Sequence, residues 1–300
     1  MKKTILVTGS NGLLGQKLVK LITDKNEYQL IATAKGENRL PADENYIYHS
    51  LDITNKEEIE NLITKVNPHY IIHTAAMTNV DQCESEKEAC VKLNVDAVRY
   101  LKNACEEKNI FLLHLSTDFI FDGENGPYDE EAEGKPLSFY GESKLNAEKI
   151  LIESKGPWAI ARTVLVYGIA NDMSRSNIIL WVKKSLEDGK TINVVDDQWR
   201  TPTLAEDLAM GCYLIIKNEA KGIFNISGDE LLTPYQMAIQ TADFFKLDKN
   251  LINRATAATF TQPAKRPPRT GFIITKAREK LNYNPVSFTE GIGVMASQII

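Results

Sequence analysis

Tyr140 and Lys144 lie four residues apart in the run Phe-Tyr-Gly-Glu-Ser-Lys. Residues i and i+4 share one face of a helix, so a phenol and an ammonium would project side by side. A free tyrosine has a pKa of about 10, and a neighbouring cation favours the phenolate and brings that pKa toward working pH. Such a pair suits general acid–base catalysis. Because the same spacing also arises by chance on solvated helix faces, the hypothesis needs support from elsewhere in the chain.

Glycines at positions 9, 12 and 15 follow a short apolar run, Ile5–Val7, and lead into a helical pattern over Leu13–Thr23. This spacing permits a tight turn, close approach of the backbone to a pyrophosphate, and close packing of helix on strand. The start of the helix offers free N–H groups and the positive end of its dipole to phosphates. Since a strand precedes the glycines and a helix follows them, the loop predicts a dinucleotide-binding site.

The second predicted strand, Leu30–Ala34, indicates which nicotinamide cofactor binds. Sites for NAD usually carry an acidic residue about 20 positions past the glycines, which holds the ribose 2′-hydroxyl. Here Lys35 stands at the strand end, with Arg39 nearby. Lys35 could pair with a 2′-phosphate, which favours NADPH, although NADH stays open. The alternative is that both cations are ordinary surface charges.

Ser116 and Thr117 follow a largely apolar run, Phe111–Leu115, and Thr117 precedes Tyr140 by 23 residues. Hydroxyl groups at the carboxyl end of a parallel strand face the ligand crevice of an open α/β sheet. An isolated Ser-Thr pair is more often a turn or a helix cap. The placement of this pair before Tyr140 favours an active-site hydroxyl.

Short apolar runs alternate with amphipathic stretches in the first half of the chain, which indicates βα units around a parallel sheet. Strands buried on both faces read as continuous apolar runs, and the connection rules give right-handed crossovers. We therefore predict an α/β fold, a doubly wound parallel sheet of Rossmann type with a smaller mixed α/β substrate domain at the C-terminal end. The Rossmann domain is predicted over residues 1–168, rejoined by about 201–227, and the substrate domain over 169–300.

The individual elements follow from the same patterns. The remaining predicted strands are His69–Thr74, Trp158–Val166, Ile192–Val195 and Gly222–Ile226. The remaining predicted helices are Glu57–Lys65, Glu86–Lys108, Ser143–Glu153, Ser176–Leu186, Leu204–Ile216 and Pro234–Phe245, the last of them capped by Thr233. The segment Thr256 to Thr270, rich in Thr, Ala, Pro and Arg, is predicted to be a loop.

The composition narrows the class of protein. The chain has 300 residues, 43% of them hydrophobic and 25% charged, which is typical of a globular protein. A net charge of −5 argues against a nucleic-acid-binding surface. The four cysteines form no CxxC pair and no metal-ligand spacing, so we expect free thiols in a reducing cytoplasm and no metal site. No apolar run is long enough for a signal peptide or a membrane span.

Taken together, these motifs resemble the extended short-chain dehydrogenase/reductase superfamily, in which Ser or Thr, Tyr and Lys form the catalytic triad. Nearly the whole chain further resembles the dTDP-4-dehydrorhamnose reductases. The segments that carry the resemblance are Thr8–Gly15, Leu51–Ile53, Ala75–Glu84, Asn94, Ser116–Asp118, Tyr140–Lys144, Arg162–Thr163, Val166–Gly168, Asp197–Gln198, Pro202–Thr203 and Lys265–Pro267.

The resemblance implies that NADPH reduces the C4 keto group of a nucleotide-linked 4-keto-6-deoxyhexose, most naturally dTDP-4-dehydrorhamnose to dTDP-L-rhamnose. Tyr140 would protonate the developing alkoxide, and Thr117 would donate a hydrogen bond to the same oxygen. Lys144 would lower the pKa of Tyr140 and hold the nicotinamide ribose. The implied partners are a nucleotide-sugar substrate and, as one option, a second copy of the chain in a homodimer.

The resemblance also implies which residues contact the cofactor and which contact the substrate. The implied cofactor contacts, besides Tyr140 and Lys144, are Gly9, Asn11, Gly12, Leu13, Leu14, Gly15, Lys35, Asp52, Ile53, Ala75, Ala76 and Met77. The implied substrate contacts are Thr78, Asp81, Ser116, Thr117, Asp118, Leu165 and Arg266. Asp52 would accept from the adenine amino group. Arg266 would meet the diphosphate or orient the substrate loop, and the alternative for it is a solvated charge.

One position departs from the family pattern. Leu165 stands where the family usually has a tryptophan that packs on the sugar, and Trp199 occupies a position that usually holds a smaller or different aromatic residue. An altered sugar pocket leaves the identity of the substrate open.

Two alternative functions remain. A nucleotide-sugar epimerase or dehydratase would retain NAD and would carry an acid where this chain has Lys35. A regulatory subunit resembling the β subunit of methionine adenosyltransferase would keep the fold without catalysis. The intact set of Thr117, Tyr140 and Lys144 argues against that second alternative.

Overall fold

The computed structural model describes residues 2–41, 45–172 and 176–299. Within them, seven strands form one sheet in the order β10-β6-β5-β4-β1-β2-β3, and every neighbouring pair is parallel. The strands are β1 (Thr4–Thr8), β2 (Gln29–Ala34), β3 (Tyr46–Ser50), β4 (Tyr70–His73), β5 (Phe111–Thr117), β6 (Trp158–Thr163) and β10 (Gly222–Asn225).

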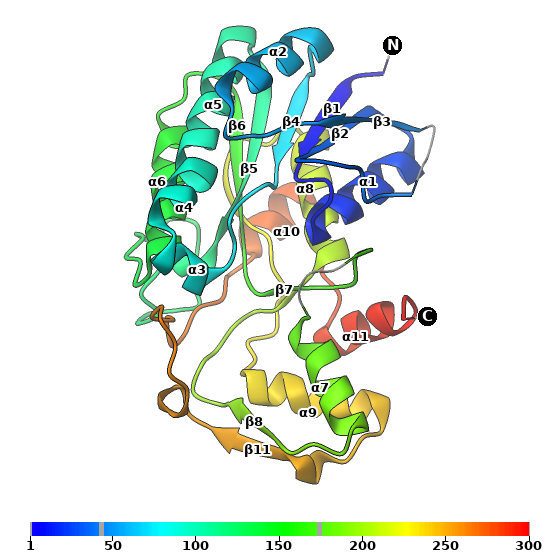
Figure 1. Ribbon diagram of the computed structural model, residues 1–300, viewed down its shortest axis with the longest axis vertical. Coiled ribbons are helices and arrows are strands. Elements are labelled where there is room, and N and C mark those ends of the chain that lie inside the picture. The colour runs from blue at the N-terminus through cyan, green and yellow to red at the C-terminus, as the bar shows by residue number, and fades with distance from the viewer. Residues whose placement is uncertain (1, 42–44, 173–175, 300) are drawn as a thin grey trace.

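Helices cover both faces of this sheet (Figure 1). Alternate strand residues point to opposite faces, so Ile5 and Val7 enter one core while Leu6 enters the other. The first core also takes residues of α1 (Leu13–Lys25), α8 (Ala205–Lys217) and α10 (Thr275–Leu281), and the second takes residues of α2 (Lys56–Val66), α5 (Ala97–Lys108) and α6 (Phe139–Ile152). The predicted doubly wound architecture is confirmed.

The long helix predicted over Glu86–Lys108 is divided in the structure. It begins at Lys87 as α4 (Lys87–Val91), passes through a π-helical turn (Lys92–Asp96) and continues as α5, and a separate helix, α3 (Val80–Ser85), precedes it. The buried Asn94 lies in the π turn, where its side chain binds both backbone groups of Met77. A π turn often marks a functional site, because it turns one side chain away from the regular helix face.

The strand predicted over Trp158–Val166 also ends early. Leu165 adopts a left-handed backbone conformation with φ of 38°, which a strand cannot continue through. Beyond it, β7 (Val166–Tyr167) leaves the main sheet and pairs with β9 (Thr203–Leu204). The prediction also missed β3, an edge strand in which Ile47 is exposed and which therefore lacks a continuous apolar run.

The C-terminal elements gather beyond the carboxyl ends of the main strands, in the lower part of Figure 1. There β8 (Ile192–Val195) pairs in parallel with β11 (Ile252–Ala255), beside α7 (Ile178–Glu187), α9 (Pro234–Phe245) and α11 (Phe288–Ala296). Thr233 caps α9 in a capping box, as predicted. The chain returns to the main sheet through β10, and a domain boundary at residue 168 stays a prediction.

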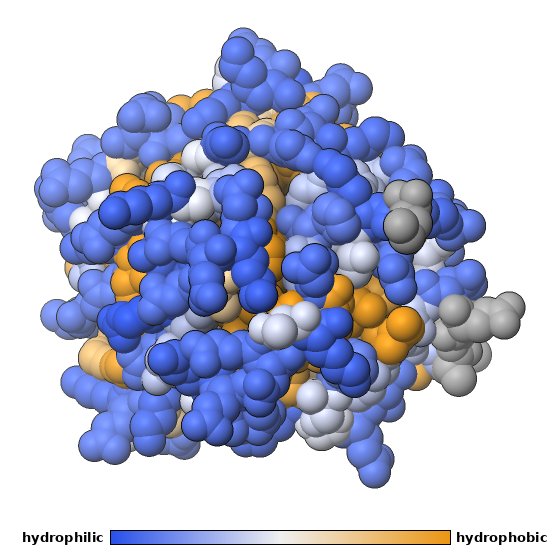
Figure 2. All heavy atoms as spheres, turned by 90° about the horizontal axis from the view of Figure 1, so that it is seen from above, coloured by the Kyte–Doolittle hydropathy of each residue, from blue (hydrophilic) through white to orange (hydrophobic). Residues whose placement is uncertain are grey.

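The opposite end of the molecule carries the amino ends of the strands. Figure 2 shows that polar side chains cover most of this face, with apolar side chains in a central strip and in a patch to the right of it. None of the described helices is long and apolar enough to cross a membrane. The candidate site residues lie at the other end of the sheet.

Candidate functional site

The glycine loop is built for close contact with an anion. Gly9 has a φ of 69°, and a Cβ on Gly15 would lie 2.2 Å from the carbonyl oxygen of Gly9, so only glycine lets α1 approach the loop. Gly12 precedes α1, whose first turn has neither a side-chain cap nor an acidic residue. The free N–H groups and positive dipole end of this 13-residue helix therefore fit a pyrophosphate.

Asn11 links the glycine loop to the segment that follows β2. Its Nδ2 donates to the carbonyl oxygen of Glu37 at 2.8 Å, and its Oδ1 accepts from the backbone N–H of Arg39 at 2.9 Å. Leu13 and Leu14 begin α1, and Leu14 packs against the core while Leu13 approaches Gly168. The side chain of Asn11 thus orders the loop in addition to any contact with a cofactor.

Lys35 and Asp52 form an ion pair of 2.6 Å between Nζ and Oδ2. Partial burial opposes ionisation of Asp52, but the hydrogen bonds from Lys35 and Thr54, together with the charge of Lys35, outweigh it and lower the pKa of Asp52 to about 2. The Lys35 side chain is otherwise largely exposed. Ile53 is buried in the core with Ile59 and Ile63, so it offers only its backbone to a cofactor.

The segment Ala75–Met77 follows β4 and lies against the glycine loop. A Cβ on Gly9 would lie 2.8 Å from the backbone nitrogen of Ala75. Asn94 fixes the far end of the segment, since its Oδ1 accepts from Met77 N at 2.8 Å and its Nδ2 donates to Met77 O at 3.0 Å. Our site prediction omitted Asn94, although a polar residue inside an otherwise apolar helix face was a usable signal.

Tyr140 and Lys144 both lie on α6, which begins four residues earlier than predicted. Ser138 caps this helix by accepting from the backbone N–H of Gly141. Both side chains are buried, Tyr140 with 8% of its surface exposed and Lys144 with 3%. Thr117, at the end of β5, lies close enough to Tyr140 to act on its pKa through a hydrogen bond. The structure thus brings the three predicted catalytic residues to one edge of the sheet.

The pKa of Tyr140 does not follow the expectation. Burial raises it well above the usual value, and the hydrogen bond with Thr117 offsets only part of that rise. The net pKa of Tyr140 is therefore raised where a lowered value was expected, and a lowering effect of Lys144 on it stays a prediction. Lys144 Nζ instead donates to His114 Nε2 at 3.1 Å, and burial lowers the pKa of Lys144 to about 8.

Two buried histidines support Lys144. His73 on β4 and His114 on β5 are register neighbours, and their rings stack with centroids 5.4 Å apart. Burial lowers the pKa of His73 to about 3 and that of His114 well below its usual value, so both rings are neutral near pH 7. A neutral ring nitrogen accepts a hydrogen bond, as His114 does from Lys144. His73 in turn binds Thr8 Oγ1 at 2.8 Å, next to the glycine loop.

Asp118 makes its contacts within the protein. It is buried and accepts hydrogen bonds from Thr117 and Thr270, and Arg200 Nε lies 3.7 Å from its Oδ2. The carboxylate thus ties the end of β5 to the C-terminal loop. Ser116 is buried beside it, and its hydroxyl has no hydrogen-bond partner among the described residues.

Arg266 is not a solvated charge. Its guanidinium lies 2.8 Å from Asp81 on α3, and the backbone N–H of Ala264 donates to the same carboxylate at 3.1 Å. This arrangement orients the loop around residue 266, which was one of the two predicted roles. Two other predicted substrate contacts are exposed to solvent. Thr78 lies just before α3, and Leu165, between β6 and β7, is 43% exposed.

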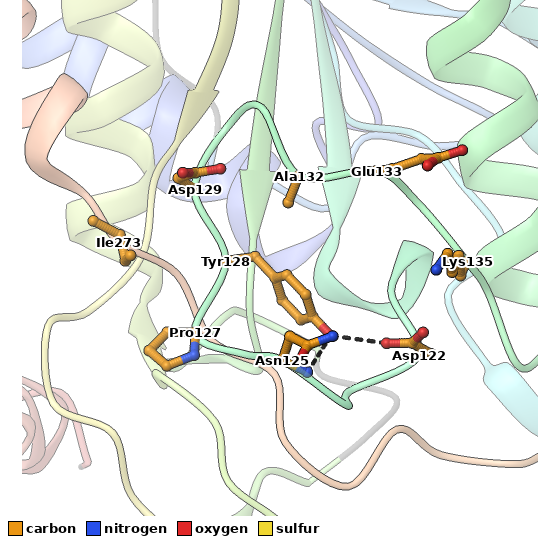
Figure 3. A pocket seen from close by; sticks show the side chains of 9 residues that line it. All are labelled: Asp122, Asn125, Pro127, Tyr128, Asp129, Ala132, Glu133, Lys135 and Ile273. Carbon is orange, nitrogen blue, oxygen red and sulfur yellow. Dashed lines mark hydrogen bonds between the residues drawn. The ribbon is translucent and has the colours of Figure 1, made fainter.

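A surface pocket of about 320 Å³ lies apart from these residues, in the loop that follows β5 (Figure 3). Asp122, Asp129 and Glu133 line it, with Lys135 the one cation among its lining residues, and Tyr128 donates to Asp122 at 2.9 Å. This acidic lining would repel a diphosphate. Neither the glycine loop nor Tyr140 contributes to it, so we do not place the active site there.

Among the described residues, no group of three or more His, Cys, Asp or Glu could hold a metal ion. All four cysteines are buried, and none of them forms a disulfide.

Comparison with known proteins gives three findings. The model of the family described as the RmlD substrate binding domain matches residues 1–300. A dTDP-4-dehydrorhamnose reductase of Aggregatibacter actinomycetemcomitans is 31% identical over 293 residues, 94% of either chain. The methionine adenosyltransferase 2 subunit beta of Rattus norvegicus is 31% identical over 259 residues, 85% of this chain and 75% of that protein.

Solved structures agree with this picture. The dTDP-4-dehydrorhamnose reductase of Bacillus anthracis, determined in complex with NADP, superposes with a TM-score of 0.87 at 25% identity and full coverage of both chains. A reductase of the same description from Clostridium acetobutylicum gives a TM-score of 0.84 at 26% identity, covering 98% of this chain and 99% of that one.

Proposed function

Because the chain belongs to the RmlD substrate-binding domain family, we propose that it is an NADPH-dependent reductase of a nucleotide-linked 4-keto-6-deoxyhexose. The first substrate to test is dTDP-4-dehydrorhamnose, with dTDP-L-rhamnose as the product. The observation that supports the proposal best is that Thr117 lies close enough to Tyr140 to act on its pKa, with Lys144 one turn further along α6. These groups lie at the sheet edge where ligands of such folds bind.

Different residues of the chain would bind different parts of the dinucleotide. The glycine loop and the start of α1 would hold the pyrophosphate, since no acidic side chain opposes an anion there. Lys35 and Arg39 would receive the 2′-phosphate, and Asp52 the adenine amino group. When bound, NADPH would supply the hydride for C4 of the sugar.

The chain itself would handle the proton. The raised pKa of Tyr140 keeps its phenol protonated near pH 7, which is the form that a proton donor needs. Tyr140 would pass this proton to the alkoxide oxygen formed at C4, and Thr117 would stabilise the same oxygen by a hydrogen bond. Lys144, held by His114, would fix the nicotinamide ribose.

Replacement of Tyr140 tests the proposal directly. The wild-type protein should oxidise NADPH steadily when a dTDP-4-keto-6-deoxyhexose is supplied, as followed by the absorbance of the reduced nicotinamide. Tyr140→Phe should lower turnover by roughly 10²–10⁴-fold, the usual contribution of a general acid. NADPH affinity, measured by cofactor fluorescence, should stay nearly unchanged. A phenylalanine variant that turns over normally would show that Tyr140 is not the proton donor.

A non-catalytic role is the second candidate, because the methionine adenosyltransferase subunit is as similar to this chain as the reductase is. Absence of turnover with a panel of keto-sugar nucleotides, together with tight association with another enzyme, would favour that role. An epimerase or dehydratase would instead copurify with NAD, which denaturation would release for assay.

A further inference from the structure

Cys83 and Cys90 form a buried thiol pair that the proposed mechanism does not use. Both side chains are fully buried, and neither forms a disulfide in this structure. They pack with Tyr140 in one small cluster, separate from the two cores of the main sheet. A chemical modification of either sulfur would therefore occur in contact with Tyr140, the side chain that we propose as the proton donor.

The break between α3 and α4 brings the two sulfurs together. In an unbroken helix, residues seven apart would be separated by two turns, or about 10 Å. Here Glu86 interrupts the helix with φ of −120° and ψ of 54°. Cys83 on α3 then packs in one cluster with Cys90 on α4, close enough to act on the pKa of Cys90.

Polar neighbours favour the thiolate of Cys90. Its Sγ lies 3.4 Å from Ser143 Oγ and 3.4 Å from Asn94 Nδ2. The hydrogen bond from Cys83 and these two contacts lower the pKa of Cys90 to about 7, against the effect of burial. The other two cysteines are different, because burial raises the pKa of Cys212 to about 12 and that of Cys105 further. Because the thiolate is the nucleophile, Cys90 would react with an oxidant before Cys105 or Cys212.

We propose that Cys83 and Cys90 are a reversible thiol–disulfide site, closed by hydroperoxides, whose oxidation lowers the activity of the adjacent site. The Cys90 thiolate attacks the peroxide O–O bond, which gives a sulfenic acid on Cys90 and releases one water after protonation. Cys83 then attacks that sulfur and expels a second water. Two thiols and one hydrogen peroxide thus become one disulfide and two waters. Thiol reductants reverse the step.

Formation of the disulfide would disturb both Tyr140 and the segment around Met77. The Cys90 sulfur would exchange its contacts with Ser143 and Asn94 for a covalent bond of about 2.05 Å to Cys83. Asn94 also holds the Met77 backbone, and Tyr140 packs directly on the sulfurs. We expect turnover to fall roughly tenfold or more, since small displacements of catalytic groups are costly. The expected loss of turnover rests on the proposed reductase function.

Peptide mapping of the native full-length protein tests the site without any assay of activity. After brief exposure to hydrogen peroxide and alkylation of the remaining thiols, we expect a linked peptide that joins Cys83 to Cys90, and its loss after treatment with dithiothreitol. Cys105 and Cys212 should stay reduced. Equal oxidation of all four cysteines, or no link between Cys83 and Cys90 in the folded protein, would overturn the proposal.

Two matched variants test the consequence. Cys90→Ala should make NADPH turnover insensitive to peroxide, whereas Cys212→Ala, which removes an equally buried thiol, should leave peroxide sensitivity as in the wild type. If Cys90→Ala does not fold, Cys83→Ala can be tested in its place. If the link forms but turnover does not change, the regulatory clause is wrong. If the link forms in a protein without turnover, the thiol site stands and the reductase proposal fails separately.

Discussion

At the scale of single residues, burial sets the chemistry of the candidate site. The same desolvation raises the pKa of Tyr140 and lowers that of Lys144, because it disfavours a phenolate and an ammonium alike. His114 and His73 are neutral for the same reason, and this neutrality lets His114 accept from Lys144. The site therefore holds a protonated phenol beside a cation that titrates near pH 8.

Lys144→Met is expected to stabilise the protein and to abolish turnover. Lowering the pKa of Lys144 from 10.5 to about 8 corresponds to a penalty of about 3 kcal/mol for the buried ammonium. The penalty is complete below pH 8, where the folded and unfolded states both carry the proton, and it disappears as the pH rises toward 10.5. The gain of the variant in urea denaturation should therefore be larger at pH 7 than at pH 10. A variant less stable than wild type at pH 7 would show that the contact with His114 outweighs the cost of burial.

At the scale of elements, the start of α6 decides where Tyr140 points. The predicted helix began at Ser143 and so left out Gly141, a poor helix former that lies in the first turn of α6. In the structure Gly141 is required there, since a Cβ would lie 2.1 Å from the carbonyl oxygen of Phe119. Close packing of α6 on the turn after β5 places Tyr140 against Thr117.

Gly141→Ala should lower both stability and turnover. The added methyl must displace backbone, and overpacking of this kind typically costs about 1–3 kcal/mol. Because α6 would shift away from β5, turnover should fall while NADPH binding changes less. Gly156→Ala is the control, since its Cβ would meet nothing closer than 3.4 Å. Denaturation midpoints and turnover of both variants provide the measurement, and equal effects in the two would contradict the packing argument.

At the scale of the whole molecule, contacts between distant segments close the C-terminal loop over the sheet edge. Arg266 reaches Asp81 across 185 residues of sequence, and Thr270 reaches Asp118 across 152. Both acids follow strands of the main sheet, on α3 and in the turn after β5. The loop is thereby attached to the same edge that carries Tyr140.

Arg266→Met should raise the KM for the nucleotide sugar more than it lowers kcat, because it frees the loop without touching Tyr140. Asp81→Asn should act similarly, and the double variant should be less impaired than the product of the two single effects. Groups in direct contact usually couple by about 0.5–3 kcal/mol. A matched cycle on the exposed pair Lys20 and Asp24 should show almost no coupling. Fully additive effects at Asp81 and Arg266 would contradict a shared role.

The sequence by itself determined the α/β alternation, the glycine loop before α1 and the spacing of Tyr140 and Lys144. Each of these is a local pattern, set by the period of a strand or a helix and by the needs of a tight turn. Hydroxyls at the end of β5 followed as well, since parallel strands share one carboxyl edge.

Only the tertiary structure decided what those residues meet. It placed Lys144 against His114, Met77 against Asn94, Asp81 against Arg266 and Cys83 against Cys90. It also reversed the expected direction of the Tyr140 pKa. Spacing along a chain specifies which residues share a face, but burial and the partners on other elements exist only after the chain has packed, and those are what move a proton affinity.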